Sequence, residues 1–335
     1  MNGMSLHQAI LTMNGSEIIN QLAAIAQGNG FEVRRENGEV KINAPLGQVT
    51  FKVNGLQTLV IFNAPSPPEL QLLKELYAAR IEKLRLSSAI EWIATPGKRP
   101  LNQTRAEVLS CKQISPTFMR MRLTGDFSAY ALREAGLHFR FLLGPNGSDL
   151  PTLDEKGLTR WPGGLAAWHR PVFTVRRISD THDWIDVDIA LHEGGRTTHW
   201  CQSVIPGTIV GLNGPSGSKM PIASRLVLFG DETAMPVILR ILDAAPSTTT
   251  AAATIAIRDP ADAQAIHSSA ETSLSWCEMR HENTLLKGLQ NLDLNEKNLF
   301  VFFAAERALA DRARAFMKTS GLAASRFRVA SYWTK

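Results

Sequence analysis

The chain of 335 residues is poor in cysteine and contains no long apolar run, and both shortages exclude classes of protein. Its three cysteines, Cys111, Cys201 and Cys277, are isolated from one another in the sequence, so their spacing indicates neither a disulfide framework nor a thiolate metal site. An iron–sulfur cluster needs about four thiolate ligands. If this protein moves electrons, an organic cofactor therefore has to carry them.

No stretch approaches the roughly 18 to 20 consecutive apolar residues of a membrane-spanning helix, and the N-terminal segment lacks the pattern of a secretory signal. We therefore expect no membrane insertion and a cytoplasmic location. The net charge of +5 favours anionic partners in general. The basic residues are spread along the chain without a nucleic-acid-binding signature, so we expect no nucleic acid partner.

The hydrophobic pattern changes twice along the chain, which predicts three domains. Residues 1–95 are predicted to form a small α+β module, and the breakers and charges of residues 95–100 are typical of a linker. No catalytic cluster is visible in this module, so we expect a structural or docking role for it. Its helices and strands are predicted over residues 16–26, 31–36, 47–53, 56–63 and from Pro67 onward, where Leu70, Leu73, Tyr77, Ile81 and Leu84 form an apolar stripe.

The two regions that follow differ in rhythm. Residues 100–218 contain short strands separated by turn residues, which is typical of an antiparallel β-barrel, and the loop over 146–164 is expected to cover one mouth of it. Residues 222–335 alternate strands with helices, which indicates a parallel sheet covered on both faces. The predicted strands cover residues 105–111, 117–123, 138–143, 172–178, 184–191 and 208–212 in the barrel, and 225–229, 252–257, 274–279, 299–303 and 327–331 in the sheet.

Three segments have the residue types needed to hold a flavin and a nicotinamide dinucleotide. The first is the strand over 172–176, where alternation places Thr174 and Arg176 on one face and Phe173 and Val175 on the other. Thr174 could bond to a flavin ring, and Arg176 could meet a phosphate. The same pattern also suits an ordinary barrel strand with a surface arginine.

The second segment is the start of a helix at Gly195, where unpaired backbone amides and the hydroxyls of Thr197 and Thr198 could bind a phosphate. An ordinary helix cap is the alternative. The third is Gly230, which follows an apolar strand and could let the backbone approach a pyrophosphate. Asp231 and Glu232 beside it could instead be the acids that commonly open a helix.

Together these segments resemble the siderophore-interacting proteins, a family of flavin-dependent ferric-siderophore reductases related to ferredoxin reductases. The family shows a flavin strand R-x-Y-T-x-R, a G-P-A-S-x-W phosphate segment, and later P-G-D, G-P-x-G, G-D-E-T-A-x-P, G-E and a terminal Y-W. Residues 100–335 keep seven such elements in the family's order. The matching positions are 173–176, 195–200, 206–208, 214–217, 230–236, 305–306 and 332–333.

The resemblance implies that NAD(P)H reduces FAD and that the flavin passes electrons to a ferric siderophore, from which ferrous iron is released. It also implies an FAD-binding barrel and an NAD(P)-binding α/β domain, with the ferric chelate near Arg140 in place of the family's H-x-K lysine. The residues expected to bind the cofactors are Arg170, Phe173, Thr174, Val175, Arg176, His192, Gly195, Arg196, Thr197, Thr198, Trp200, Gly230, Asp231, Glu232, Thr233, Ala234, Arg258 and Glu306.

Arg258 follows the second strand of the last domain, where a positive charge would read a 2′-phosphate and favour NADPH, with NADH as the alternative. Arg258 could also pair with Asp259 or Asp262. Two departures from the family concern the flavin strand: Pro171 replaces its first arginine and Phe173 its tyrosine. Arg170 or Arg196 could supply the missing charge, and we expect FAD binding to persist.

Two other functions stay open at this point. One is a general flavin or ferredoxin-type reductase that has a different acceptor. The other is a siderophore-binding protein with weakened flavin binding, which the residues at positions 171 and 173 make credible.

Overall fold

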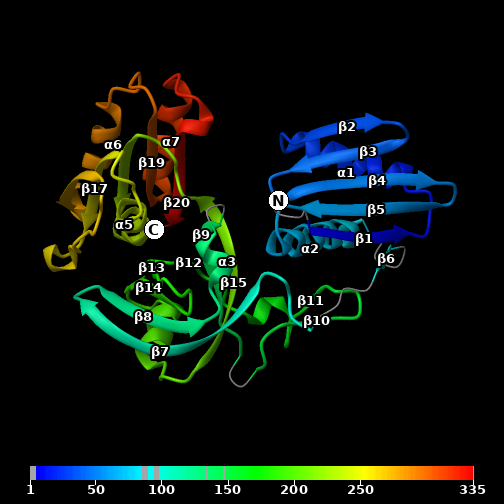
Figure 1. Cartoon of the computed structure of the whole chain (residues 1–335), viewed down its shortest axis with the longest axis horizontal. Helices are drawn as coiled ribbons and strands as arrows, with labels where there is room; N and C mark the ends of the chain where they lie inside the picture. Colours follow the sequence, from blue (N-terminus) through cyan, green and yellow to red (C-terminus); the bar gives the residue numbers. More distant parts are fainter. Residues whose placement is uncertain (1–4, 85–89, 94–97, 133–134, 146–147, 335) are drawn as a thin grey trace. The chain divides into compact units, whose positions relative to one another are not determined.

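The computed structural model describes residues 5–84, 90–93, 98–132, 135–145 and 148–334 (Figure 1). The chain divides into two compact units. Met1–Gln103 and Leu142–Arg170 form the N-terminal unit, while Thr104–Phe141 and Pro171–Lys335 form the large unit. The predicted domain limits at residues 95–100 and 218–222 stay predictions.

The N-terminal unit contains a six-stranded sheet in the order β2-β3-β4-β5-β1-β6, whose strands pair antiparallel. Its core joins the sheet to α1 and α2, with Leu22, Phe51, Phe62 and Tyr77 among the buried side chains. The elements are β1 (Ser5–Leu11), α1 (Ser16–Gly28), β2 (Glu32–Glu36), β3 (Glu39–Ala44), β4 (Gly47–Asn54), β5 (Gln57–Ala64), α2 (Pro67–Lys83) and β6 (Ile90–Trp92).

Both helices predicted in this unit are confirmed, but strands β1, β3 and β6 were not predicted. The buried positions of β1 are His7, Ala9 and Leu11, and a histidine and an alanine do not produce a clear apolar alternation. The unit also contains the connection Leu142–Arg170, which carries the short strands β10 (Thr152–Leu153) and β11 (Thr159–Arg160). The loop predicted over 146–164 therefore holds a hairpin.

In the large unit, the first sheet has seven strands in the order β12-β9-β15-β7-β8-β14-β13. Among the described residues, the strand pairing does not form a closed ring, although the two outermost strands, β12 and β13, are consecutive in the chain. Between them, Val175 donates its amide to Leu137 on one side, and Arg176 donates its amide to Asp186 on the other. The sheet is therefore barrel-like rather than a closed barrel, and the backbone of Val175 and Arg176 connects its two edges.

The elements of this domain are β7 (Gln103–Ser115), β8 (Phe118–Gly125), α3 (Ser128–Ala131), β9 (Gly136–Leu142), β12 (Val172–Thr174), β13 (Arg177–Ile178), β14 (Trp184–Ala190), α4 (Arg196–Ser203) and β15 (Ile209–Lys219).

The second sheet is parallel, with five strands in the order β18-β17-β16-β19-β20, as the sequence predicts. Leu226 and Leu228 pack with α5 on one face, and Val227 and Phe229 pack with α6 and α7 on the other. Phe118 of the barrel-like domain shares the α5 core, so the two domains of the large unit have a common interior. The elements are β16 (Arg225–Asp231), α5 (Met235–Asp243), β17 (Thr250–Ile257), β18 (Glu271–Glu278), α6 (Asn283–Gln290), β19 (Leu299–Glu306), α7 (Arg307–Thr319) and β20 (Phe327–Trp333).

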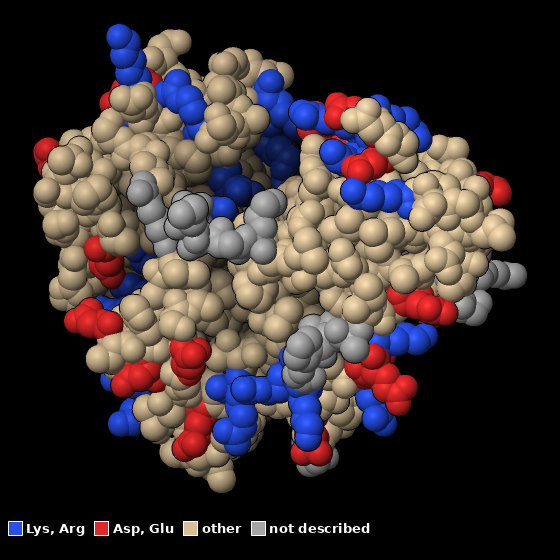
Figure 2. Space-filling view, turned by 45° about the vertical axis from the view of Figure 1, so that its right-hand side comes forward, with Lys and Arg blue, Asp and Glu red and all other residues tan. Residues whose placement is uncertain are grey.

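Charges of both signs lie side by side on the surface. In Figure 2, Lys and Arg side chains alternate with Asp and Glu along the lower part of the face shown. Among the described residues, no helix combines the length and apolar character needed to cross a membrane.

Candidate functional site

A chain of hydrogen bonds joins the predicted flavin strand to the last strand of the parallel sheet. Thr174 on β12 pairs in register with His138 on β9, and its Oγ1 lies 3.1 Å from His138 Nδ1. The other ring nitrogen, His138 Nε2, lies 3.2 Å from the hydroxyl of Tyr332 on β20. Burial, with Arg240 and Arg328 adding to it, lowers the pKa of His138 to about 4. The ring is therefore neutral at pH 7 and holds both hydroxyls.

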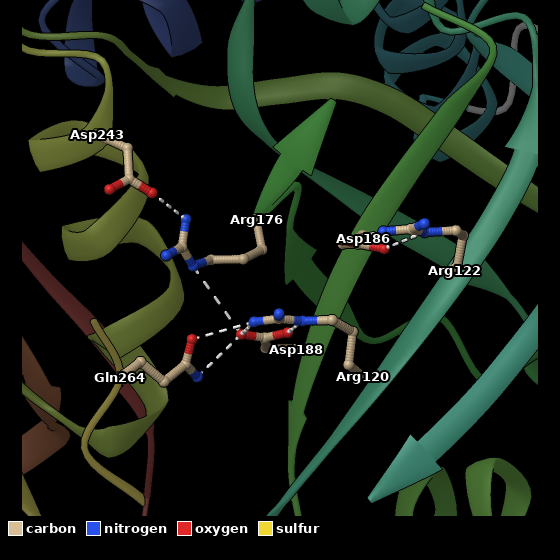
Figure 3. Close-up of polar contacts among 7 residues, drawn as sticks. All are labelled: Arg120, Arg122, Arg176, Asp186, Asp188, Asp243 and Gln264. Carbon is tan, nitrogen blue, oxygen red and sulfur yellow. Dashed lines mark hydrogen bonds and ion pairs between the residues drawn. The ribbon is translucent and has the colours of Figure 1, made fainter. Parts of the chain in front are cut away.

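Arg176 does not lie on the surface, and carboxylates surround its guanidinium (Figure 3). Its Nη1 donates to Asp243 of α5 at 2.6 Å, and its Nε lies 4.0 Å from Asp188 of β14. Burial lowers the pKa of Arg176, but an arginine stays charged at neutral pH. Arg176 thus links the barrel-like domain to α5 of the parallel-sheet domain. Two of its nitrogens, Nε and Nη2, have no hydrogen-bond partner among the described residues.

The carboxylates around Arg176 belong to a larger network on neighbouring strands (Figure 3). Arg120 binds Asp188 through two hydrogen bonds of 2.7 and 2.8 Å, and Gln264 donates to the same carboxylate at 3.0 Å. Arg122 binds Asp186 in the same bidentate way, at 2.8 and 2.9 Å. Arg120–Asp188 and Arg122–Asp186 are therefore two ion pairs, and the first of them is connected to Arg176 through Asp188.

The predicted phosphate segment begins a short helix, α4. Gly195 precedes it, and a Cβ at this position would lie 2.4 Å from His192 Nε2, so the absence of a side chain lets the two segments approach. Thr198 Oγ1 accepts the amide of His192 at 3.1 Å. The hydroxyl residues Thr197 and Thr198 are buried, whereas Arg196 is exposed. The amides of the first helical turn have no carbonyl within the helix to bond to, which suits a phosphate.

Three aromatic rings pack between α4 and the flavin strand. Phe141 of β9 lies edge-on to Phe173, with ring centroids 5.4 Å apart, and tilted to Trp200 of α4 at 5.3 Å. Phe173 is half-buried, so part of its ring stays accessible. Val175, which follows the end of β12, is fully buried.

The glycine at the end of β16 meets helix atoms. A Cβ at Gly230 would lie 2.6 Å from Ile238 Cδ1 and 2.7 Å from Ala234 Cβ, so close packing of α5 already requires glycine here. Asp231 is fully buried, and burial raises its pKa. Its carboxylate accepts from Thr233 N and Oγ1 at 3.0 and 2.6 Å.

The other oxygen of Asp231 connects the C-terminal ends of β16, β19 and β20. It accepts the amide of Glu306 at 2.9 Å and the indole of Trp333 at 2.8 Å. Glu306 in turn accepts the amide of Ala308 at 2.6 Å and caps α7. Asp231 and Glu306 therefore organise the sheet edge where a nucleotide is expected.

Arg258 pairs with neither of the aspartates considered from the sequence. Its Nε bonds to Glu232 at 2.6 Å, and its Nη2 donates to the carbonyl of Leu191 at 2.6 Å. Asp262 instead accepts from Ser115 and Thr117 of the barrel-like domain. About two fifths of the Arg258 side chain is exposed, at 41%, so a ligand can still reach it.

The two remaining predicted arginines lie in different units. Arg140 is exposed on β9, opposite Val172 of β12. Arg170 belongs to the N-terminal unit, where its guanidinium lies 5.2 Å from the ring centroid of Trp161. Arg170 as a substitute for the missing family arginine stays a prediction.

The sequence did not point to Arg240 or Asp243, which form the polar side of α5. Arg240 Nη1 donates to the carbonyl of Leu137 at 3.1 Å, and burial lowers its pKa to about 10. Together with Arg176 these residues border a cavity of about 820 Å³. The sequence signal that could have revealed them is the presence of two charged residues, Arg240 and Asp243, in an otherwise apolar helix.

The cysteines are less isolated than their spacing suggests. The Cys201 thiol on α4, together with burial, raises the pKa of the Cys111 thiol on β7, so the two side chains lie close together, and Cys201 Sγ lies 3.5 Å from Met119 Sδ. All three cysteines are free thiols. The two cysteines are 90 positions apart in the sequence, so no argument from local spacing could have paired them.

Comparison with known families agrees with this arrangement. The model described as the siderophore-interacting FAD-binding domain matches residues 107–219, and the model described as siderophore-interacting protein matches residues 223–335. The chain therefore belongs to the siderophore-interacting protein family, and it carries that family's FAD-binding domain.

Individual relatives are distant. The ferric vibriobactin reductase ViuB of Vibrio cholerae is 25% identical over 240 residues, which cover 67% of this chain and 86% of the relative. The crystal structure of a siderophore utilization protein from T. fusca has 23% identity and a TM-score of 0.60, over 72% of this chain and 95% of that one. The siderophore-interacting protein SipS from Aeromonas hydrophila has 22% identity and a TM-score of 0.57, over 70% and 92%. These structures support the fold.

Proposed function

We propose that this protein is an FAD-dependent reductase that takes electrons from NAD(P)H and delivers them to a ferric siderophore, with release of ferrous iron in the cytoplasm. Bound FAD would supply the conversion of a two-electron hydride donor into one-electron steps. The hydrogen-bonded residues Thr174, His138 and Tyr332 are the main structural support, because they join the flavin strand to the nucleotide-binding sheet.

The residues present fit FAD. Gly195 and the first turn of α4 would hold its phosphates, and the unpartnered nitrogens of Arg176 supply further donors within the same domain. Thr174 would bond to the flavin ring. When His138 Nδ1 carries the ring proton and donates it to Thr174 Oγ1, the threonine hydroxyl hydrogen is available to a ligand.

At the nucleotide end, Gly230, Thr233 and Ala234 would line the approach of the nicotinamide dinucleotide. Asp231 would act through the position of Thr233 and Trp333, because its oxygens are already bonded to them. Arg258 would bind a 2′-phosphate and give NADPH preference over NADH. Arg140 would attract the anionic ferric chelate.

One anaerobic titration tests this proposal. The purified protein, loaded with FAD, should lose its yellow absorbance when NADPH or NADH is added, and it should regain that absorbance with ferric citrate while a ferrous chelator reports iron release. Bleaching without reoxidation by ferric citrate or ferric hydroxamates, but with reoxidation by a quinone, would point to a reductase with a different acceptor.

A second candidate is a siderophore-binding protein with weakened flavin binding. It is favoured by the ion pair between Arg176 and Asp243, since that pair competes with a phosphate for the guanidinium. Pro171 also removes the family's first arginine. A colourless protein that binds a ferric siderophore but not added FAD would support this candidate.

A further inference from the structure

Three polar residues on one face of α2 bind a hairpin from a distant part of the chain. Lys74 is fully buried, and its Nζ donates to the carbonyl of Gly157 at 3.1 Å. Gln71 donates to the same carbonyl at 3.4 Å and to Glu75 at 2.9 Å. Glu75 accepts the hydroxyl of Thr159 on β11. One turn of α2 thus binds both the turn and one strand of the β10–β11 hairpin.

Lys74 is an unusual choice for this place in the core. Burial lowers the pKa of Lys74 to about 8, although the carboxylates of Glu75 and Asp154 act in the opposite direction. Its Nζ also lies 5.7 Å from the ring centroid of Trp92. An apolar side chain would fill this position without the cost of removing an ammonium group from water. The ammonium is therefore best explained by the hairpin that it holds.

The turn of the hairpin is built so that its carbonyl can be held. Asp154 Oδ1 accepts the amides of Lys156 and Leu158, each at 2.9 Å, and the amide of Gly157 bonds to the carbonyl of Asp154 at 2.9 Å. Gly157 has φ of +69°, which a glycine adopts easily. These bonds within the turn give it one conformation, so the contacts with α2 hold the hairpin as a rigid unit.

The hairpin lies in the connection between β9 and β12, the two strands that carry the candidate site. Arg140 pairs with Val172, and the pairing continues through Phe141 N to Pro171 O at 3.0 Å. It ends with two bonds of 3.0 and 2.9 Å between Leu143 and His169. A connection of this length without anchorage would open easily and loosen the end of the ladder.

We propose that α2 is a positioning device for the ferric-chelate site: Lys74, with Gln71 and Glu75, anchors the β10–β11 hairpin and thereby keeps the Arg140 end of the β9–β12 ladder in one arrangement. The role of Arg140 rests on the proposed function, whereas the anchorage does not. This assigns a purpose to the N-terminal unit, for which no catalytic cluster was evident.

The test uses the full-length holoprotein and two readouts. Lys74→Met removes the ammonium at similar volume, and Lys83→Met is the control, because Lys83 is an exposed lysine on the same helix. Amide exchange over residues 152–160 should be about tenfold faster in Lys74→Met and unchanged in Lys83→Met. The KM for ferric citrate should rise about fivefold in Lys74→Met, while kcat with a neutral quinone stays unchanged.

Further variants separate positioning from general damage. Arg140→Ala should also raise the KM for ferric citrate, and Lys74→Met should add little in that background, because both act on the same contact. If Lys74→Met does not fold, Gln71→Leu provides a milder loss of the same carbonyl contact.

The anchorage, the positioning role and the proposed function are each tested by a different outcome. Unchanged exchange over residues 152–160 would overturn the anchorage, and faster exchange with an unchanged KM would overturn the positioning role. A wild-type protein that does not reduce ferric citrate or ferric hydroxamates would count against the proposed function, and the exchange rates would still decide the anchorage.

Discussion

The two units each bury a cation completely, but they compensate its charge in different ways. In the N-terminal unit, Lys74 donates to the backbone carbonyl of Gly157, and the charges of Glu75 and Asp154 act on it. In the large unit, Arg176 bonds directly to Asp243 and lies close to Asp188. An arginine keeps its charge and a lysine can lose its proton, so only the cation of the N-terminal unit can be neutralised as pH rises.

The strongest test of this contrast removes the partner of the arginine. Asp243→Ala should lower the free energy of unfolding by about 3 kcal/mol, because it leaves a buried guanidinium without its closest counter-charge. Urea unfolding at pH 7 measures this loss. Asp311→Ala, an exposed aspartate on α7, is the control. A loss no larger than that of the control would mean that Asp188 alone balances Arg176.

Acid should destabilise both units through one histidine in each. Burial lowers the pKa of His7 and of His138 to about 4 from an ordinary value of 6.5. Between these values the unfolded chain binds the proton and the folded protein does not, so stability falls as pH falls through this window. From pH 7 to pH 5 the loss should be about 2 kcal/mol for His138, and His7 acts in the same direction. His138→Asn should unfold with a weaker pH dependence than the wild type, and an unchanged dependence would contradict the assignment.

Lys74→Met should behave unlike Asp243→Ala. At pH 7 its free energy of unfolding should lie within about 1 kcal/mol of the wild type, since the lost hydrogen bond is offset by the removed desolvation cost. The lowered pKa of Lys74, about 8, means that the unfolded chain binds more protons between pH 8 and 10.5. Wild-type stability should therefore gain from Lys74 as pH rises through this range, and the variant should lack that gain. If urea unfolding gave wild type and Lys74→Met parallel pH profiles, Lys74 would make no pH-dependent contribution to stability.

The ion pair between Arg258 and Glu232 is a third case, in which the arginine side chain is partly exposed. Arg258→Ala should raise the KM for NADPH about tenfold, equal to about 1.4 kcal/mol, and change the KM for NADH little, because only NADPH carries the 2′-phosphate. Arg280→Ala is a matched control, since Arg280 also pairs with a glutamate just beyond a strand of the same sheet. Equal effects on both nucleotides would mean that the contact of Arg258 with Glu232 is only structural.

The sequence was sufficient for the fold class and for the order of the motifs. The switch from strands at 105–212 to alternating strands and helices predicted the parallel sheet, because period and turn residues are local properties. Strand β1 was not predicted, because two of its buried positions are His7 and Ala9 and the sequence therefore shows no clear apolar alternation.

What each charged residue contacts was decided by the tertiary structure alone. Arg176 meets Asp243, Arg258 meets Glu232, and Cys111 meets Cys201 across separations that no local pattern encodes. Lys74 shows the limit most clearly, because it lies within the apolar stripe of α2 and its partner is 83 residues away. Local sequence therefore determined which elements form and which motifs they carry. Burial and long-range contact, which depend on how those elements pack, determined which charges are compensated and which donors stay available for a ligand.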